Sequence, residues 1–391
     1  MFNVFGDILA RAYASQHKVI SIDNSVAKLH YRLTFWMLLA CTCLVCSRQY
    51  IGEHIRCIVD KGVPPHVVNT YCFSMTTYTV LPQGNHSHQF AHPGVQPHSD
   101  NERIIRHAYY QWTPFVLFGQ ALLFYMPHML WKIFEGGTIR NMVEGLQRLY
   151  LRAPDDNDRQ ISGFHVYSQK SMSKAVVNLH KQFQLISRFR LNRYWAFMLI
   201  TCEALNLVNV LIQLRVIDRF LGGSFFSLGR RILAGNPGDN PFEEVFPKVT
   251  KCDFHKYGPS GTIQLHDAMC VMALNIVNEK IYAMMWFWFA LLIPLTVFAL
   301  LWRLITFLLH SRSERFNHYL LKETTGTKMS PVDVAILTKQ SCFNDWLLLY
   351  YLGSNMDAIV FTEMLHNLAT DLEEHRQSPD FEDEKKPLKG A

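Results

Sequence analysis

Residues 109–131 read YYQWTPFVLFGQALLFYMPHMLW, and this stretch decides the fold class. Its 23 residues include no Lys, Arg, Asp or Glu. A helix of about 20 apolar residues crosses the roughly 30 Å hydrocarbon core of a bilayer. Tyr109, Tyr110 and Trp112 open the stretch and Trp131 closes it, and such aromatic ends are typical of membrane interfaces. The stretch is therefore predicted to be a transmembrane helix rather than a buried helix of a soluble protein.

Three further apolar segments are long enough to span a bilayer, and they alternate with polar ones. We therefore expect an all-α membrane protein with a four-transmembrane-helix bundle and some short β-strand in the loops. The predicted order is an N-terminal segment (1–31), span one (32–51), loop one (52–108), span two (109–131), a helical loop (132–193), span three (194–217), loop two (218–280), span four (281–302), a helical C-terminal domain (303–370) and a disordered tail (371–391).

The distribution of charge orients these segments. Residues 132–193 carry eleven Lys or Arg against five Asp or Glu, whereas residues 218–280 carry seven of each. Because Lys and Arg accumulate on the cytoplasmic side of membranes, residues 132–193 are predicted to be cytoplasmic. Four spans then put both termini in the cytoplasm and both remaining loops outside the cell.

The nine cysteines divide in the same way. Five are expected to be reduced because they lie in spans or cytoplasm: Cys41, Cys43, Cys46, Cys202 and Cys342. The other four lie two in each outer loop: Cys57, Cys72, Cys252 and Cys270. These four are expected to form two disulfides, and the residues alone leave all three pairings open.

The first outer loop also carries a glycosylation sequon, Asn85-His86-Ser87, on the side where it could be used. Four histidines crowd beside or within it: His86, His88, His92 and His98. Their irregular spacing between prolines argues against a metal site, and no metal or cofactor is expected. Imidazoles titrate near neutral pH, so acid sensing by this cluster is a hypothesis.

Several motifs together resemble the innexins, the gap-junction channel proteins of invertebrates. Tyr109-Tyr110-Gln111-Trp112 matches the family's signature at the outer start of span two. Residues 63–72, VPPHVVNTYC, are similar to the first outer loop of insect innexins. Residues 246–252, FPKVTKC, with 254–261, FHKYGPSG, are similar to the second, and 274–280, LNIVNEK, leads into span four as in that family. The resemblance extends from about residue 22 to about residue 357.

This resemblance implies a large-pore channel at the plasma membrane, built from eight four-helix subunits. Two such half-channels dock between cells and pass ions and small metabolites, and other innexins are possible partners besides membrane lipids. Neither catalysis nor a nucleic-acid partner is implied. The family's crosswise disulfides, carried onto this chain, are Cys57 with Cys270 and Cys72 with Cys252. The segment from Met1 to about Tyr13 becomes a funnel inside the pore.

Charged and polar side chains near the predicted pore are candidates for setting ion preference, since rings of charge act on permeating ions. The candidates are Asn3, Asp7, Arg48, Glu53 and Arg56. Their opposite signs leave the net selectivity open. Glu203 and Arg215 lie within span three, where a charge faces either a partner inside the bundle or a watery path.

Prolines inside two spans, Pro114 and Pro294, remove backbone donors and can bend their helices, which makes them gating candidates. A static kink is an equally good interpretation.

The sequence leaves three other functions to be considered. A glycan at Asn85 on the docking face would favour an undocked hemichannel that releases metabolites. The CxxC spacing of Cys43 and Cys46 permits a membrane thiol oxidoreductase. A tetraspanin-like organiser is disfavoured by the long first loop and the missing CCG motif.

Overall fold

The computed structural model describes residues 20–52, 54–59, 62–80, 94–95, 103–143, 194–235, 241–325, 330–356 and 358–377. Several predicted features lie outside these ranges: the funnel from Met1 to Tyr13 with Asn3 and Asp7, Glu53, the sequon at Asn85, and His86, His88, His92 and His98. The chain divides into two compact units. We call residues 26–127 and 205–297 the sheet unit, and residues 1–25, 128–204 and 298–391 the helical unit.

Long helices dominate the fold. The first begins with α2 (Ser25–Lys28) and a π-helical turn (Leu29–Thr34) and continues as α3 (Phe35–Ile51). The others are α5 (Tyr109–Glu135), α8 (Trp195–Phe220) and α11 (Ala273–Leu309). Among the described residues, three helices could cross a membrane by length and apolar composition: Ser25–Ile51, Trp195–Phe220 and Ala273–Leu309. Helix α5 is not among these three, because Gln, His, Pro and Tyr side chains lower its mean hydropathy although residues 109–131 carry no charge.

Aromatic contacts pack these helices together within the sheet unit. The Trp288 indole N–H of α11 donates to the Thr34 hydroxyl over 2.9 Å. The Phe124 ring of α5 stacks on Phe289 of α11, and its neighbour Tyr125 meets Phe35 of α3. Helix α5 therefore contacts both α3 and α11.

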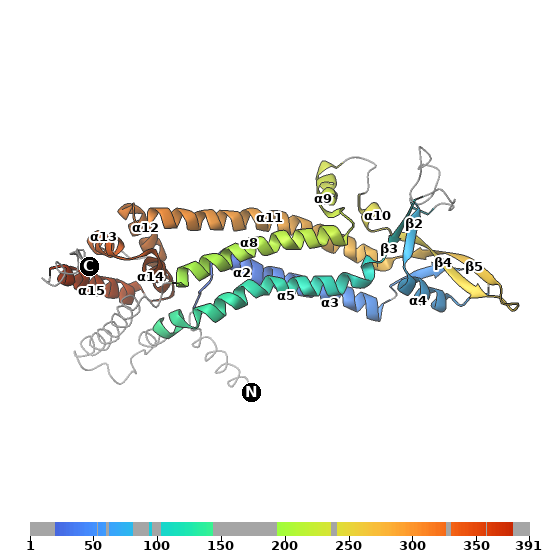
Figure 1. Ribbon diagram of the computed structural model, residues 1–391, viewed down its shortest axis with the longest axis horizontal. Coiled ribbons are helices and arrows are strands. Elements are labelled where there is room, and N and C mark those ends of the chain that lie inside the picture. The colour runs from blue at the N-terminus through green and yellow to red at the C-terminus, as the bar shows by residue number, and fades with distance from the viewer. Residues whose placement is uncertain are drawn as a thin grey trace, which may run out of the picture. The chain divides into compact units, whose positions relative to one another are not determined.

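The sheet unit also contains a five-stranded antiparallel sheet, which lies at one end of the long helices (Figure 1). In the sequence, β1 comes directly after α3, β3 directly before α5 and β5 directly before α11. Its strand order is β1-β5-β4-β2-β3. The strands are β1 (Arg56–Ile58), β2 (Thr77–Val80), β3 (Ile104–His107), β4 (Val249–Tyr257) and β5 (Ile263–Val271). Strands β4 and β5 have nine residues each, longer than the short strands that the sequence predicts.

The long β4–β5 hairpin has a simple physical basis. On β5, Ala268 and Cys270 are buried between exposed neighbours, which is the period-two pattern of a half-buried strand, and they pair with the buried Cys252 and Thr250 of β4. The turn closes where the Gly258 N–H donates to the Thr262 carbonyl. All-α thus describes the long helices but not the loops that join them.

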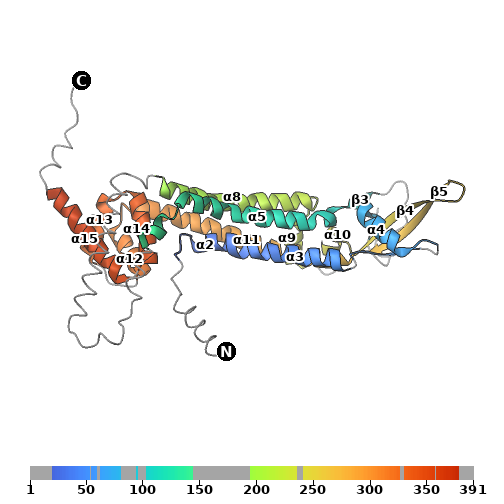
Figure 2. The same ribbon diagram turned by 90° about the horizontal axis from the view of Figure 1, so that it is seen from below.

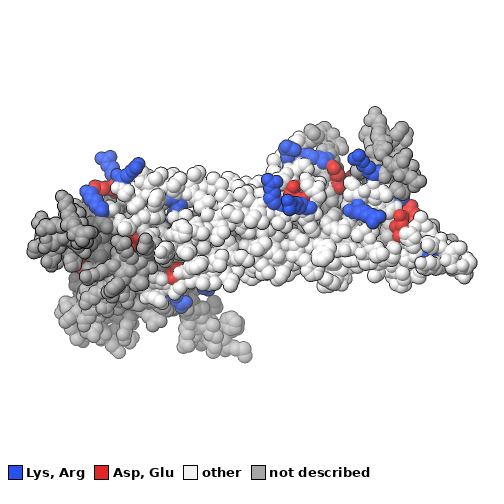
Figure 3. Space-filling model, in the orientation of Figure 1, with Lys and Arg blue, Asp and Glu red and all other residues white. Residues whose placement is uncertain are grey.

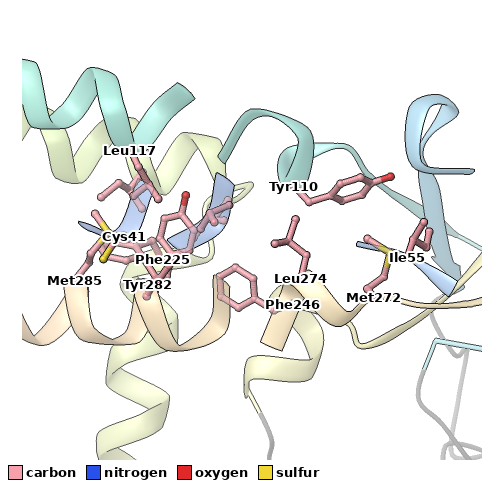
Figure 4. Close-up of a cluster of buried hydrophobic side chains, with 14 of the residues drawn as sticks. Cys41, Ile55, Tyr110, Leu117, Phe225, Phe246, Met272, Leu274, Tyr282 and Met285 are labelled. Carbon is pink, nitrogen blue, oxygen red and sulfur yellow. The ribbon is translucent and has the colours of Figure 1, made fainter. Parts of the chain in front are cut away.

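The sheet unit also has three short helices among its described residues: α4 (Pro65–Met75), α9 (Phe225–Ala234) and α10 (Pro241–Val245). Helix α4 begins at a proline, whose missing N–H costs nothing in the first turn. Figure 4 shows the core beneath these elements, where Phe246 and Tyr282 lie near Leu274. The Phe246 and Tyr282 rings stack with centroids 5.5 Å apart.

The described part of the helical unit holds four further helices, which gather as a cluster in Figure 2. They are α12 (Glu314–Thr325), α13 (Pro331–Gln340), α14 (Phe343–Asn355) and α15 (Ala358–Gln377). Helix α14 supplies much of the core, with Trp346, Leu348 and Leu352 buried. Helix α15 continues past residue 371, where the sequence predicts the tail to begin, because Leu368, Ala369 and Leu372 still pack on that core.

Candidate functional site

Two disulfides join loop one (52–108) to loop two (218–280). Cys57 of β1 is bonded to Cys270 of β5, its register partner, and Cys72 of α4 is bonded to Cys252 of β4. This is the pairing that the family resemblance implies. The bonds close chain separations of 213 and 180 residues. In the chain-entropy model, loops of this length correspond to about 5 kcal/mol of stabilisation for each bond.

The two cross-links lie side by side. Sulfur atoms of Cys57, Cys72 and Cys270 all lie within 4.8 Å of one another. Metal binding requires free thiolates, and these sulfurs are bonded to each other or to Cys252, so the cluster braces the loops rather than holding an ion. The sheet and α4 are therefore fixed to each other at one buried point.

The signature tetrad attaches α5 to this brace. The Tyr110 hydroxyl donates to the carbonyls of Cys72 and Phe73 at 3.4 and 3.3 Å. The Gln111 side-chain amide donates to the carbonyls of Phe73 and Ser74 at 2.5 and 3.2 Å. The last carbonyls of a helix have no partner within it, so these two side chains cap the C-terminal end of α4.

The other two residues of the tetrad face different surroundings. Tyr109 meets the rings of Phe246 and Phe220, with centroids 5.8 and 6.5 Å away. Trp112 is 60% exposed. The tetrad therefore uses three side chains to hold the two loops against the helix ends and presents the fourth outward.

Side-chain hydrogen bonds join β2 to the strands on either side of it in the sheet, β4 and β3. The Tyr78 hydroxyl donates to the Asp253 carboxylate over 2.8 Å, and burial together with that carboxylate raises the pKa of Tyr78. His107 hydrogen-bonds the Thr79 hydroxyl through Nε2 at 2.8 Å. Burial lowers the pKa of His107 to about 4, so its ring is neutral at neutral pH.

Two predicted pore residues lie within the described ranges. Arg48, in the last turn of α3, and Arg56, on β1, are both exposed, which a pore-lining side chain requires. One chain encloses no pore, so the lining role of both arginines stays a prediction. Pro114 is buried and Pro294 is exposed, and each lies inside a continuous helix, so their gating role also stays a prediction.

The CxxC pair on α3 lacks the surroundings that an oxidoreductase needs. Cys43 and Cys46 are free thiols. Exchange would require a second reactive pair, and Cys57 and Cys72 are buried and bonded to other partners rather than to each other. The thiol-exchange function is therefore not supported.

Glu203 finds its partner inside the helical unit. The Arg303 guanidinium of α11 donates Nε–H and Nη2–H to the two Glu203 oxygens at 3.0 and 2.6 Å, and Nη2–H also to the Tyr351 hydroxyl of α14 at 3.1 Å. All three side chains are buried. Of the two interpretations left open by the sequence, the partner inside the protein is correct.

A clamp on the segment before α2 escaped sequence reasoning. The Asn355 side chain of α14 accepts from the Ser21 N–H at 2.6 Å and donates to the Ser21 carbonyl at 3.0 Å. The Trp131 indole donates to the Ile22 carbonyl at 3.1 Å, and Asp23 lies 3.3 Å from His128. Nothing in the spacing of these residues signals their contacts, and the one between Ser21 and Asn355 joins positions 334 residues apart.

Comparisons with known proteins agree with this architecture. A family model described as Innexin matches residues 23–372. The chain is 42% identical to Innexin inx7 of Drosophila melanogaster, with 95% of this chain and 85% of the relative covered. It is 38% identical to Innexin inx2 of Schistocerca americana, covering 95% and 99% of the two chains, and 33% identical to Innexin shaking-B of Drosophila melanogaster, covering 93% and 95%. The similarity includes all four long helices and both cross-linked loops.

Proposed function

The chain belongs to the innexin family, and from that premise we propose that four of its helices cross the plasma membrane, with both termini in the cytoplasm. Innexins form gap-junction channels, and the chain is a plasma-membrane subunit of such a channel, which passes ions and small metabolites between adjacent cells. It is a channel protein rather than an enzyme.

Helix α5 is the proposed membrane span that is not among the three helices selected by length and hydropathy. Its 23-residue run without charge has the required length, and it packs against α3 and α11 through Tyr125 and Phe124. The basic character of residues 132–193 supports the cytoplasmic side for the following loop. The sheet and its disulfides then lie outside the cell, in the compartment where disulfides persist.

One observation supports docking above all others: two adjacent disulfides and the α4 cap fix the outer loops into a single braced sheet. Binding is weakened when loops must be ordered on contact, so a pre-formed cap favours association of two half-channels. We propose a ring of eight subunits that docks through this sheet with a ring of the next cell, alone or mixed with other innexins.

The pore of this proposal is lined by the N-terminal segment, α3 and the start of loop one. Asn3, Asp7, Arg48, Glu53 and Arg56 are the proposed lining residues. Arg48→Glu reverses one charge per subunit and is expected to shift the reversal potential toward cation selectivity. Recording single half-channels in asymmetric salt checks this, and an unchanged reversal potential would place Arg48 away from the pore.

The docking proposal is tested by dual whole-cell recording from pairs of communication-deficient cells that both express the chain. We expect a junctional conductance that is absent when only one cell expresses it and the other carries no innexin. Surface expression in both cells without junctional conductance would overturn docking. In that case the chain would function as an undocked half-channel. Asn85→Gln would then test whether a glycan on the sequon keeps the rings apart.

A further inference from the structure

One face of α8 changes from apolar to basic near the end of the helix. Val208, Leu211 and Ile212 are exposed, and the next exposed positions at helical spacing along the same face include Arg215 and Arg219. In a helix that crosses a bilayer, such a change marks the level where hydrocarbon gives way to head groups, since long basic side chains reach toward the interface.

Helix α9 lies at this same level. The Arg215 guanidinium lies over the Phe226 ring of α9, 5.7 Å from its centroid. On its other side α9 rests on Trp286 of α11, so closely that a Cβ on Gly229 would overlap the indole ring. Figure 1 shows α9 running across the direction of α8 and α11 rather than alongside them, as a helix lying along the membrane plane would if α8 and α11 span the membrane.

The outward face of α9 is amphipathic. Phe226 is 43% exposed and Leu233 is 67% exposed, and Arg230 lies between them at helical spacing. On the face that Figure 3 shows, charged groups lie over α9 and the adjoining end of α8, and the helix surface next to them is uncharged. A helix with this arrangement, lying in the membrane plane, is typical of interfacial helices.

Among the described residues, the acids near these arginines already have partners. Glu244 pairs with Arg231 at 2.6 Å, and Asp218 accepts from the Phe226 N–H. In the part of the chain that the structure describes, Arg215, Arg219 and Arg230 have no carboxylate partner. Three unpaired guanidinium groups beside apolar surface call for an anionic group attached to hydrocarbon.

We propose that Arg215, Arg219 and Arg230 bind the phosphate of an outer-leaflet phospholipid. Its acyl chains lie along Val208, Leu211 and Ile212, and Phe226 and Leu233 insert into the same leaflet. Guanidinium groups match phosphate oxygens with paired hydrogen bonds. This inference rests on the proposed membrane orientation. A neighbouring subunit fits less well, because the centres of protein interfaces are depleted of unpaired charge.

Native mass spectrometry of the full-length assembled channel, titrated with phosphatidylcholine, tests the site. The variant is Arg215→Gln, Arg219→Gln, Arg230→Gln, and the control removes three exposed charges from the sheet by Arg103→Gln, Arg106→Gln, Lys256→Gln. Charge-assisted bonds at the site predict at least a roughly tenfold loss of lipid affinity in the variant. The control should bind like the wild type, and inorganic phosphate should not displace the lipid.

Equal lipid binding by variant and control would overturn the site, and so would displacement by inorganic phosphate alone. Dissociation of the variant into smaller assemblies with unchanged lipid per subunit would assign the surface to a neighbouring subunit instead. The orientation is checked separately by labelling Thr262→Cys on intact cells with an impermeant thiol reagent. If Thr262→Cys is labelled but the triple arginine variant binds lipid as tightly as the wild type, the lipid site is rejected while the proposed membrane orientation is retained.

Discussion

The two units of the molecule are held together by different chemistry. The sheet unit carries two disulfides and a continuous five-stranded sheet. In the described part of the helical unit there is no disulfide, and a buried Glu203–Arg303–Tyr351 network and the Asn355 clamp hold its helices instead. In the proposed topology the sheet lies outside the cell, where disulfides persist, and the helical unit lies in the reducing cytoplasm. Covalent bracing suits a surface that must dock unchanged, whereas hydrogen bonds and ion pairs can rearrange.

The largest expected effect comes from removing one cross-link. Cys252→Ser leaves Cys72 unpaired and removes about 5 kcal/mol of loop-closure stabilisation. We expect junctional conductance between paired cells to be lost. Cys43→Ser removes a free, exposed thiol and should leave conductance intact. Wild-type conductance in Cys252→Ser pairs would show that the braced sheet is not needed for docking.

The matching change in the helical unit is Glu203→Gln. It leaves Arg303 buried without its carboxylate, which typically destabilises a protein by about 3–5 kcal/mol. The thermal midpoint of the purified channel should fall, while both disulfides stay formed. The double variant Glu203→Gln, Arg303→Met removes the uncompensated charge and should recover part of the loss. A midpoint that does not move would mean that the network does not hold this unit.

Acid is expected to weaken the sheet unit through His107. Its folded pKa is about 4 because of burial, below the ordinary value of 6.5. The unfolded chain therefore takes up the proton first, and stability is full above pH 6.5 and falls as the pH drops toward 4. The expected loss at pH 5 is about 2 kcal/mol. Denaturant unfolding at pH 7 and pH 5 measures it, and His107→Gln, which cannot titrate, should show a smaller change. Identical pH profiles would contradict the role of His107.

A smaller effect is expected where α5 caps α4. Gln111→Ala leaves the Phe73 and Ser74 carbonyls without these donors and should cost about 1–2 kcal/mol. Trp112→Phe, at the exposed position beside it, changes no contact with α4 and serves as the control. Denaturant unfolding measures the midpoint of each variant. Equal midpoints would show that Gln111 does not stabilise the sheet unit.

How far the sequence predicts each unit depends on how local the signal is. The uncharged run 109–131 and the aromatic ends of the spans are local, so helices could be predicted from them. The pairing of β4 with β5 was underestimated because Lys251, Asp253 and His255 make β4 look like a polar loop. Partners distant in the chain were missed altogether: Glu203 signals the need for a partner but not that it is Arg303, and no pattern links Ser21 to Asn355.

An image of the purified particle tests the central claim most directly, because it reports the subunit number, the position of the sheet and the docked state together. We expect rings of eight subunits, stacked in pairs that touch through the braced sheets. Rings of another number, or pairs joined through the helical units, would contradict it.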